Sequence, residues 1–355
     1  MSVFFIAEAG VNHNGIKDMA FRLIDAALAS GADAVKFQTF NAEALASSTA
    51  PKAAYQNKTT NAAESQLDML RRLELPRAWH AELMAYCDDK GIVFLSTPFD
   101  SQSLTFLSRE LGVETIKVPS GEVTNGPFLL EIARTGCDII LSTGMSTLDE
   151  VRTALGVLAF GLIDAQGTPS MDGFKAAFES ADGQAALKLK VTVLHCTSAY
   201  PTPLTDANVR AMVTIRDTFG LKTGFSDHTE GDTASLAAAA LGADVIEKHF
   251  TLDRSLPGPD HKASLEPEAL GAMIQAIRSI ETALGNGIKA PREIEADTRR
   301  VVRKSLTALE DIAEGTVLSS TTLGAMRPGS GMSPMHFWEH IGHTTPRALK
   351  KGELL

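Results

Sequence analysis

Eight short runs of apolar residues recur between Val3 and Phe250, and each is followed by a polar cluster and then by a segment with helical spacing. The runs are VFFIAEAG, AVKFQTF, IVFLSTPF, TIKVPSGE, DIILSTGM, VTVLHCTS, TGFSDH and DVIEKHF. Strands that are buried on both faces and alternate with helices form a parallel sheet. Eight such units predict an α/β fold of the closed (β/α)8 or TIM-barrel type, with a doubly wound open sheet as the alternative.

The composition changes after the apolar helical segment PEALGAMIQAIRSIETAL, which ends at Leu284. We therefore expect a catalytic barrel over residues 1–284 and a polar linker over 285–302. Short alternating runs and turns follow, and they predict a mostly-β domain over 303–355. A domain of this size is only marginally stable alone, so we expect it to dock onto another surface.

Two connections are longer than the others. Residues 39–76 follow the second strand, so we expect them at the catalytic face of the barrel. Residues 161–190 lie between a helix and the sixth strand, which places them at the opposite face, and we assign them no chemistry.

Charge and cysteine content exclude several classes of protein. The 355 residues contain 33 Lys and Arg against 43 Asp and Glu, a net charge of −10, which argues against a general nucleic-acid or membrane-surface binder. The three cysteines have no paired spacing, so we expect neither a disulfide framework nor a thiolate zinc site. The N-terminus lacks the basic region of a signal peptide, and a cytoplasmic location is expected.

Polar and ionisable side chains stand at or just after the carboxyl end of every predicted strand. They are Glu8, Asn12, His13, Lys36, Gln38, Thr97, Lys117, Ser120, Glu122, Ser142, Thr143, His195, Ser198, Tyr200, Ser226, Asp227, His228, Glu247, Lys248 and His249, together with the aromatic Phe99. A solvated strand end explains any one of them alone. Because all eight carboxyl ends of a barrel converge, one functional pocket explains the whole set.

The residue types in this set suggest particular chemistry. Lys36 and Lys117 lie within apolar strands, so their ammonium groups need anionic partners. Those partners are either carboxylates such as Glu8 or Glu122, or a bound anion that carries phosphate and carboxylate groups. His228 and His249 follow adjacent strands and can share a divalent cation, although two histidines alone are a weak metal signal. Glu122, in the turn after PSG, is a candidate for moving a proton.

The successive motifs IAEAGVNHNG, VKFQTF, FLSTPFD, IKVPSGE, LSTGM, LHCTSAYPTP, FSDHT, IEKHFTLD and PGPDHKAS resemble those of sialic acid synthases, in the same order. The tail, RKSLTALEDIAEGTVLSSTTLGAMRPGSGMSP, resembles the antifreeze-like (SAF) domain that ends those enzymes. The resemblance spans nearly the whole chain and leaves out mainly residues 161–190.

The resemblance implies a transferase that joins phosphoenolpyruvate to the open-chain aldehyde of N-acetylmannosamine. The product would be N-acetylneuraminate, with phosphate released by C–O cleavage. The alternative is an N,N'-diacetyllegionaminate synthase, since those enzymes share the motifs and use a 2,4-diacetamido-6-deoxymannose. Two other classes stay open: a pyruvate lyase that forms a Schiff base on Lys36 or Lys117, and a non-catalytic sugar-binding protein.

The resemblance also implies roles for individual residues. His228 and His249 would hold Mn²⁺ or Mg²⁺, and Glu122, Glu8 and Arg327 would take part in catalysis. The substrate-binding residues would be Lys36, Thr97, Lys117, Ser120, Ser142, Ser198, Tyr200, Ser226 and Asp260. Arg327 would enter the barrel of a second copy, which implies a domain-swapped homodimer.

Overall fold

The computed structural model describes residues 2–47, 52 and 64–355. It divides into two compact units, Met1–Gly285 and Asn286–Leu355. Residues 48–51 and 53–63, which belong to the long connection over 39–76, lie outside the described residues.

The first unit is built on eight parallel strands: β1 (Phe4–Gly10), β2 (Ala34–Thr39), β3 (Val93–Pro98), β4 (Thr115–Val118), β5 (Asp138–Ser142), β6 (Val191–Cys196), β7 (Lys222–Asp227) and β8 (Val245–His249). Their order in the sheet is β3-β2-β1-β8-β7-β6-β5-β4, which is the chain order read around a circle. The two end strands, β3 and β4, also lie next to each other. The predicted (β/α)8 barrel is therefore confirmed, and the open sheet is excluded.

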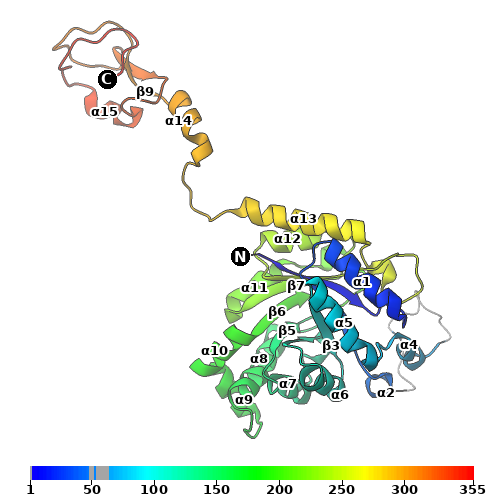
Figure 1. The fold of residues 1–355 in the computed structure, drawn as a ribbon. Coiled ribbons are helices and arrows are strands. Elements are labelled where there is room, and N and C mark those ends of the chain that lie inside the picture. Colours follow the sequence, from blue (N-terminus) through cyan, green and yellow to red (C-terminus); the bar gives the residue numbers. More distant parts are fainter. Residues whose placement is uncertain (1, 48–51, 53–63) are drawn as a thin grey trace. The chain divides into compact units, whose positions relative to one another are not determined.

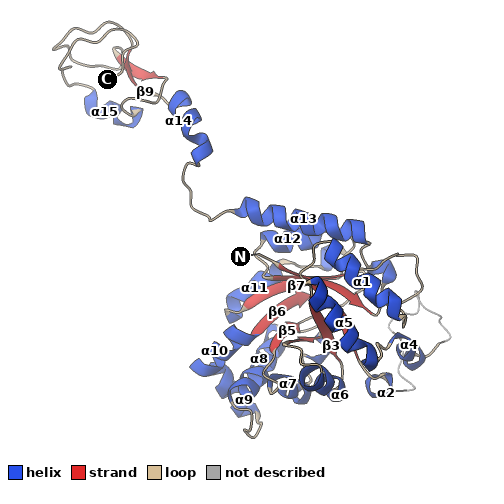
Figure 2. Ribbon diagram, viewed as in Figure 1, coloured by secondary structure: helices blue, strands red, loops and turns tan. Residues whose placement is uncertain are grey.

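Helices surround this sheet on its outer side (Figures 1 and 2). They are α1 (Lys17–Ala29), α5 (Arg77–Lys90), α6 (Ser101–Thr105) with a π-helical turn (Phe106–Glu110), α7 (Gly126–Ala133), α8 (Leu148–Ile163), α11 (Arg210–Phe219), α12 (Thr233–Ala240) and α13 (Pro267–Leu284). Each buries an apolar stripe against the strands, as α13 does with Leu270, Met273, Ile274 and Ile277. A separate small cluster fills the interior of the barrel: Ile6, Ala34, Leu95, Ile140, Leu194 and Val245.

The two long connections are largely helical where the structure describes them. The first contains α2 (Ala42–Leu45) and α4 (Gln66–Leu73). The second forms α9 (Met171–Glu179) and α10 (Ala181–Lys190), which pack against α8 before the chain enters β6.

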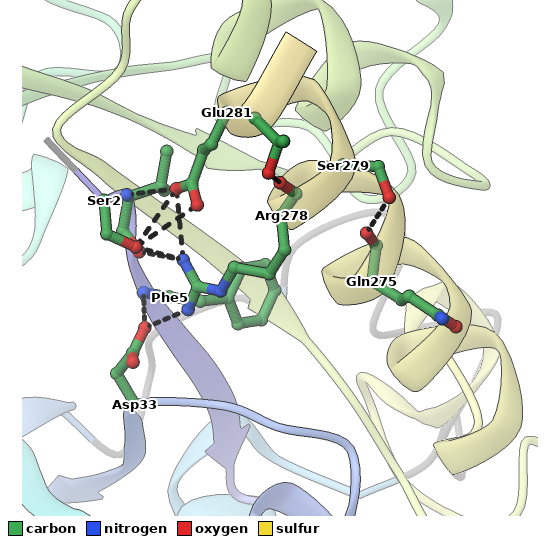
Figure 3. A network of polar contacts seen from close by, with 9 residues as sticks. Ser2, Phe5, Asp33, Gln275, Arg278, Ser279 and Glu281 are labelled. Carbon is green, nitrogen blue, oxygen red and sulfur yellow. Dashed lines mark hydrogen bonds and ion pairs between the residues drawn. The ribbon is translucent and has the colours of Figure 1, made fainter. Parts of the chain in front are cut away.

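A polar network joins β1, the first strand, to α13, the last helix of the barrel, at the amino ends of the strands (Figure 3). Arg278 on α13 donates to the Val3 carbonyl (2.6 Å) and pairs with Asp33 (2.7 Å). The same Asp33 carboxylate accepts the Phe5 backbone N–H at 2.7 Å. Glu281 lies 3.1 Å from Arg278 and accepts the Val3 backbone N–H. These contacts link the start of the barrel to its end.

The second unit begins with a 3₁₀ turn (Glu293–Glu295) and α14 (Ala296–Val302), so the segment predicted as a polar linker contains a helix. An antiparallel pair follows, β9 (Ser305–Ala308) with β10 (Leu323–Met326), and then α15 (Phe337–His340). The core of this unit consists of Leu306, Ala308, Ile312, Leu318, Leu323 and Leu349. Among the described residues of both units, every helix is too short or too polar to cross a membrane.

Candidate active site

A cavity of about 410 Å³ opens at the carboxyl ends of the strands. Most of the predicted site residues line it: Glu8, Lys36, Thr97, Lys117, Ser120, Ser142, Ser198, Tyr200, Ser226, His228, His249 and Asp260. The convergence expected of a barrel has therefore brought side chains from distant parts of the sequence into one site.

Four charged side chains form the floor of this cavity, and each is at most 5% exposed. The Lys36 ammonium lies 2.6 Å from Glu8 and 3.5 Å from Glu247. The Lys117 ammonium lies 3.3 Å from the other oxygen of Glu247. Lys36 thus has the carboxylate partner that the sequence suggested, whereas the partner of Lys117 is Glu247 and not Glu122.

Burial and pairing move the pKa values of these groups in different directions. Burial raises the pKa of Glu8 to about 7, even though Lys36 opposes that shift. Burial also acts to raise the pKa of Glu247, but Lys117 and Lys36 together hold it far below its usual value. Burial lowers the pKa of Lys117. Near neutral pH, Glu8 is therefore the carboxyl group of this set that exchanges a proton.

Hydroxyl groups surround the two lysines. Lys36 donates to the Thr97 hydroxyl (3.0 Å), and the Ser120 hydroxyl accepts the Gly144 backbone N–H (2.9 Å). The Ser142 hydroxyl is buried and has no hydrogen-bond partner among the described residues. Gly144 leaves no room for a side chain, because a Cβ there would lie 2.3 Å from the Ser198 hydroxyl. Two ammonium groups with clustered hydroxyls suit a ligand that carries phosphate and carboxylate groups.

The two predicted metal ligands lie side by side, with ring centroids 5.8 Å apart. His228 donates from Nδ1 to the Thr197 carbonyl (2.7 Å), so its Nε2 carries a lone pair, and this atom lies 3.4 Å from the Ser226 hydroxyl. Nδ1 of His249 is buried, and in the part of the chain that the structure describes it has no hydrogen-bond partner. Burial lowers the pKa of His228 to about 4 and that of His249 well below its ordinary value, so both rings are neutral at pH 7.

Neutral imidazoles with nitrogen lone pairs are suitable ligands for a divalent cation. Across residues 2–47, 52 and 64–355, no cluster of three or more His, Cys, Asp or Glu side chains has the geometry of a complete metal site. A cation held by His228 and His249 would therefore take its other ligands from water and substrate.

Asp260 reaches the cavity from the segment between β8 and α13, and burial raises its pKa to about 6. Hydrogen bonds from Ser264 and Asn12 hold this segment in place. The Ser264 hydroxyl donates to the Asp260 carbonyl (2.7 Å), and the Asn12 amide donates to Ser264 (3.0 Å) and to the Phe250 carbonyl (2.7 Å). Asn12 thus positions the segment that carries Asp260.

Three of the strand-end residues point away from the cavity. Lys248 pairs with Asp227 (2.8 Å) and donates to the Thr229 carbonyl, all on the outer side of the sheet. His195 contacts the Ala207 carbonyl at 3.0 Å. Alternation along a strand explains this result, because neighbours of inward-facing residues face outward.

Two predicted catalytic residues are not in the cavity lining. The Glu122 carboxylate accepts a hydrogen bond from the Asn125 amide (2.6 Å) in the turn after β4. Its predicted catalytic role stays a prediction. Arg327 belongs to the second unit, where it donates to the Val302 carbonyl (3.1 Å).

The sequence placed Glu247 and Gln38 in the pocket without giving either a role, and it did not single out Cys196. All three line the cavity. The signal for Glu247 was present in the alternation of β8, since Glu247 and His249 are two residues apart and must share a face.

Comparison with known proteins places the chain among sugar-acid synthases. The model of the NeuB family matches residues 23–289. N,N'-diacetyllegionaminic acid synthase of Campylobacter jejuni is 46% identical over 99% of this chain and 98% of its own length. The enzyme of the same name from Legionella pneumophila is 42% identical over 100% of this chain and 94% of its own.

Relatives with lower identity are named for other sugar acids. Human N-acetylneuraminate-9-phosphate synthase is 33% identical over 90% of this chain and 82% of its own. The crystal structure of N-acetylneuraminic acid (sialic acid) synthetase from Leptospira borgpetersenii, in complex with citrate, is 32% identical with a TM-score of 0.67, and covers 84% of this chain and 90% of that chain. The barrel, its site and these matches together show that the chain belongs to the NeuB family, the family of the sialic acid synthases.

Proposed function

We propose that this protein condenses phosphoenolpyruvate with a 2,4-diacetamido-6-deoxymannose to make N,N'-diacetyllegionaminic acid and phosphate. The observation that carries the reaction type is the cavity floor, where two buried lysines stand beside two neutral histidines. The choice of sugar rests on the two relatives named N,N'-diacetyllegionaminic acid synthase, which match along almost the whole chain. N-acetylmannosamine, the first expectation from sequence, becomes the second candidate.

Phosphoenolpyruvate fits the cationic floor. Its phosphate and carboxylate groups would lie against Lys36 and Lys117, with the Ser120 and Ser142 hydroxyls donating to the remaining oxygens. The unpartnered Ser142 hydroxyl then gains an acceptor. Held in this way, carbon 3 of phosphoenolpyruvate is oriented toward the aldehyde of the open-chain sugar.

His228 and His249 would hold the divalent cation, which when bound supplies Lewis-acid polarisation of the aldehyde. Tyr200 lies over the His228 ring, with centroids 4.2 Å apart, and limits how that ring can turn. Asp260 and Ser198 line the cavity with groups that can bind sugar hydroxyl or amide groups.

The bond changes follow from the two substrates. Carbon 3 attacks the aldehyde carbon, the aldehyde oxygen takes a proton, and cationic character develops at carbon 2. Water adds there and loses a proton, and the tetrahedral intermediate expels phosphate with cleavage of its C–O bond. Glu8 is the carboxyl group placed to give and take these protons, because its pKa is raised to about 7.

A phosphate-release assay tests this proposal. We expect phosphate only when phosphoenolpyruvate, the diacetamido sugar and a divalent cation are all present. The lowered pKa of Lys117 also suits Schiff-base chemistry, so the same protein should be treated with pyruvate and borohydride. A covalent pyruvate adduct without any phosphate release would show that the protein is a lyase and not a synthase.

A further inference from the structure

One side of the cavity is apolar, and α4 supplies much of it. Gln66, Met69, Leu70 and Leu73 line the cavity, and their spacing places them on one face of the helix. The charged residues of α4 form ion pairs elsewhere, as Arg71 does with Glu43 and Arg72 with Glu64. The apolar face of this helix is therefore directed at the substrate space.

Leu45 on α2 and Phe99 after β3 continue the same surface. With Leu70 they form an apolar wall: all three are half-buried, line the cavity and pack against a buried cluster. That cluster consists of Val11, Phe40, Met69 and Leu73. The apolar wall (Leu45, Leu70 and Phe99) thus keeps exposed apolar surface where a ligand would lie.

Contacts between segments hold the wall in place. The Arg71 guanidinium lies 2.7 Å from Glu43 and joins α4 to α2. The Glu74 carboxylate accepts the Ala42 backbone N–H, which ties the end of α4 to the start of α2. The Asn41 backbone N–H donates to Asp100 at 3.1 Å, next to Phe99. These contacts hold the wall in a fixed position, so it can discriminate between ligands by fit.

We propose that the apolar wall selects the sugar through its methyl groups, an inference that rests on the proposed function. The diacetamido sugar has a methyl group at carbon 6 and a second acetamido methyl at carbon 4, where N-acetylmannosamine has hydroxyls. Leu45, Leu70 and Phe99 have no side-chain group that can form a hydrogen bond. A sugar hydroxyl placed against them would lose its hydrogen bonds to water and gain none in return. Phosphoenolpyruvate belongs at the opposite, cationic side for the same reason.

The test compares kcat/KM for the two sugars at saturating phosphoenolpyruvate in the wild-type protein and in the Leu70→Gln and Leu45→Gln variants. We expect the wild-type protein to favour the diacetamido sugar by roughly 10–200-fold, the range for small apolar differences in a hydrophobic pocket. Each variant should reduce that ratio by about fivefold or more, with an unchanged KM for phosphoenolpyruvate. Leu189→Gln, at an exposed position on α10, is the matched control and should leave the ratio unchanged.

The outcomes separate this inference from the function on which it rests. Suppose that the wild-type protein prefers the diacetamido sugar and that both variants keep the wild-type ratio of kcat/KM values for the two sugars. This result refutes the selective role of the apolar wall and leaves the proposed function intact. A wild-type protein that releases phosphate only with N-acetylmannosamine overturns both. Leu45 and Leu70 lie on different helices. If circular dichroism shows that one variant fails to fold, the other variant supplies the test.

Discussion

Glu247 is the residue on which the charge balance of the site depends. Its two oxygens face Lys36 and Lys117, and it also accepts a hydrogen bond from Ser226 at 2.8 Å. One ionised carboxylate between two ammonium groups leaves a net positive floor when Glu8 is protonated. A buried surplus of positive charge is costly until an anion binds, which favours a ligand with more than one negative group.

Replacing Lys36 or Lys117 with Met tests this charge balance. Met keeps most of the side-chain volume and removes the ammonium group. We expect the KM for phosphoenolpyruvate to rise by a factor equivalent to about 2–5 kcal/mol, with a much smaller change for the sugar. Steady-state kinetics with each substrate varied in turn measures both effects. An unchanged phosphoenolpyruvate KM in both variants would make the lysines purely structural partners of Glu8 and Glu247.

The two histidines carry a prediction of their own. Each ring is neutral, and Nε2 of His228 and Nδ1 of His249 each offer a lone pair, so His228→Ala and His249→Ala should each weaken Mn²⁺ binding by about tenfold or more. Calorimetric titration with Mn²⁺ measures binding without relying on turnover. His80→Ala is the control, because His80 is buried between Thr39 and Pro76 and lies outside the cavity lining. Retention of full Mn²⁺ affinity in the double variant H228A/H249A would refute the assignment.

At the scale of elements, the closure of the barrel depends on contacts between segments that are far apart in sequence. α13 packs beside α1 and α12, and its Arg278 reaches the first strand (Figure 3). This network lies at the amino ends of the strands, whereas the cavity lies at their carboxyl ends. Stability and catalysis are therefore supported at opposite ends of the same strands, as is usual for this fold.

The variant Arg278→Met should separate the effect on stability from the effect on catalysis. It removes the partner of Asp33 and the donor to the Val3 carbonyl, so we expect the unfolding free energy to fall by about 1–3 kcal/mol. Both substrate KM values should stay as in the wild-type protein. Urea denaturation measures the unfolding free energy. The surface pair Lys17–Glu82 provides the control, since Lys17→Met should cost no more than about 1 kcal/mol. Equal losses in the two variants would count against a special role for the Arg278 network.

At the scale of the whole molecule, the chain has a barrel unit with the cavity and a second unit with Arg327. The second unit is small, and it exposes large apolar side chains, among them Met335 and Trp338. An exposed aromatic residue beside apolar neighbours marks a surface that another protein surface can cover. We propose, in line with the family resemblance, that two copies exchange these units and that Arg327 serves the partner's cavity.

Mixed dimers test that proposal. An Arg327→Ala chain and a Lys117→Met chain should each have little activity alone. In a mixed dimer one of the two cavities has both residues intact, so we expect recovery toward about half of the wild-type dimer's turnover. Native mass spectrometry verifies the mixed species, and phosphate release measures its activity. Inactive mixed dimers would show that Arg327 acts within its own chain or has no part in turnover.

The amino-acid sequence predicted the barrel well because the signal is local and repeated. Each apolar run, such as the one ending at Glu8, is recognisable from its own residues, and eight of them in series leave few topologies. The helices between residues 161 and 190 were not assigned, because an added pair of helices on the outer surface repeats no pattern found elsewhere in the chain. The helix over Ala296–Val302 escaped notice because its residues are polar and exposed.

The sequence by itself determined which strand ends carry ionisable groups, and convergence of the strands followed from the fold. Only the tertiary structure decided how those groups pair. Lys117 meets Glu247 and not Glu122, because side chains from different strands pair by distance across the barrel and not by order in the chain. The apolar wall could not be predicted from the sequence either, since Leu45 and Leu70 line the cavity only when two helices pack beside it. Local pattern specifies elements, whereas the chemistry of a site depends on non-local distances.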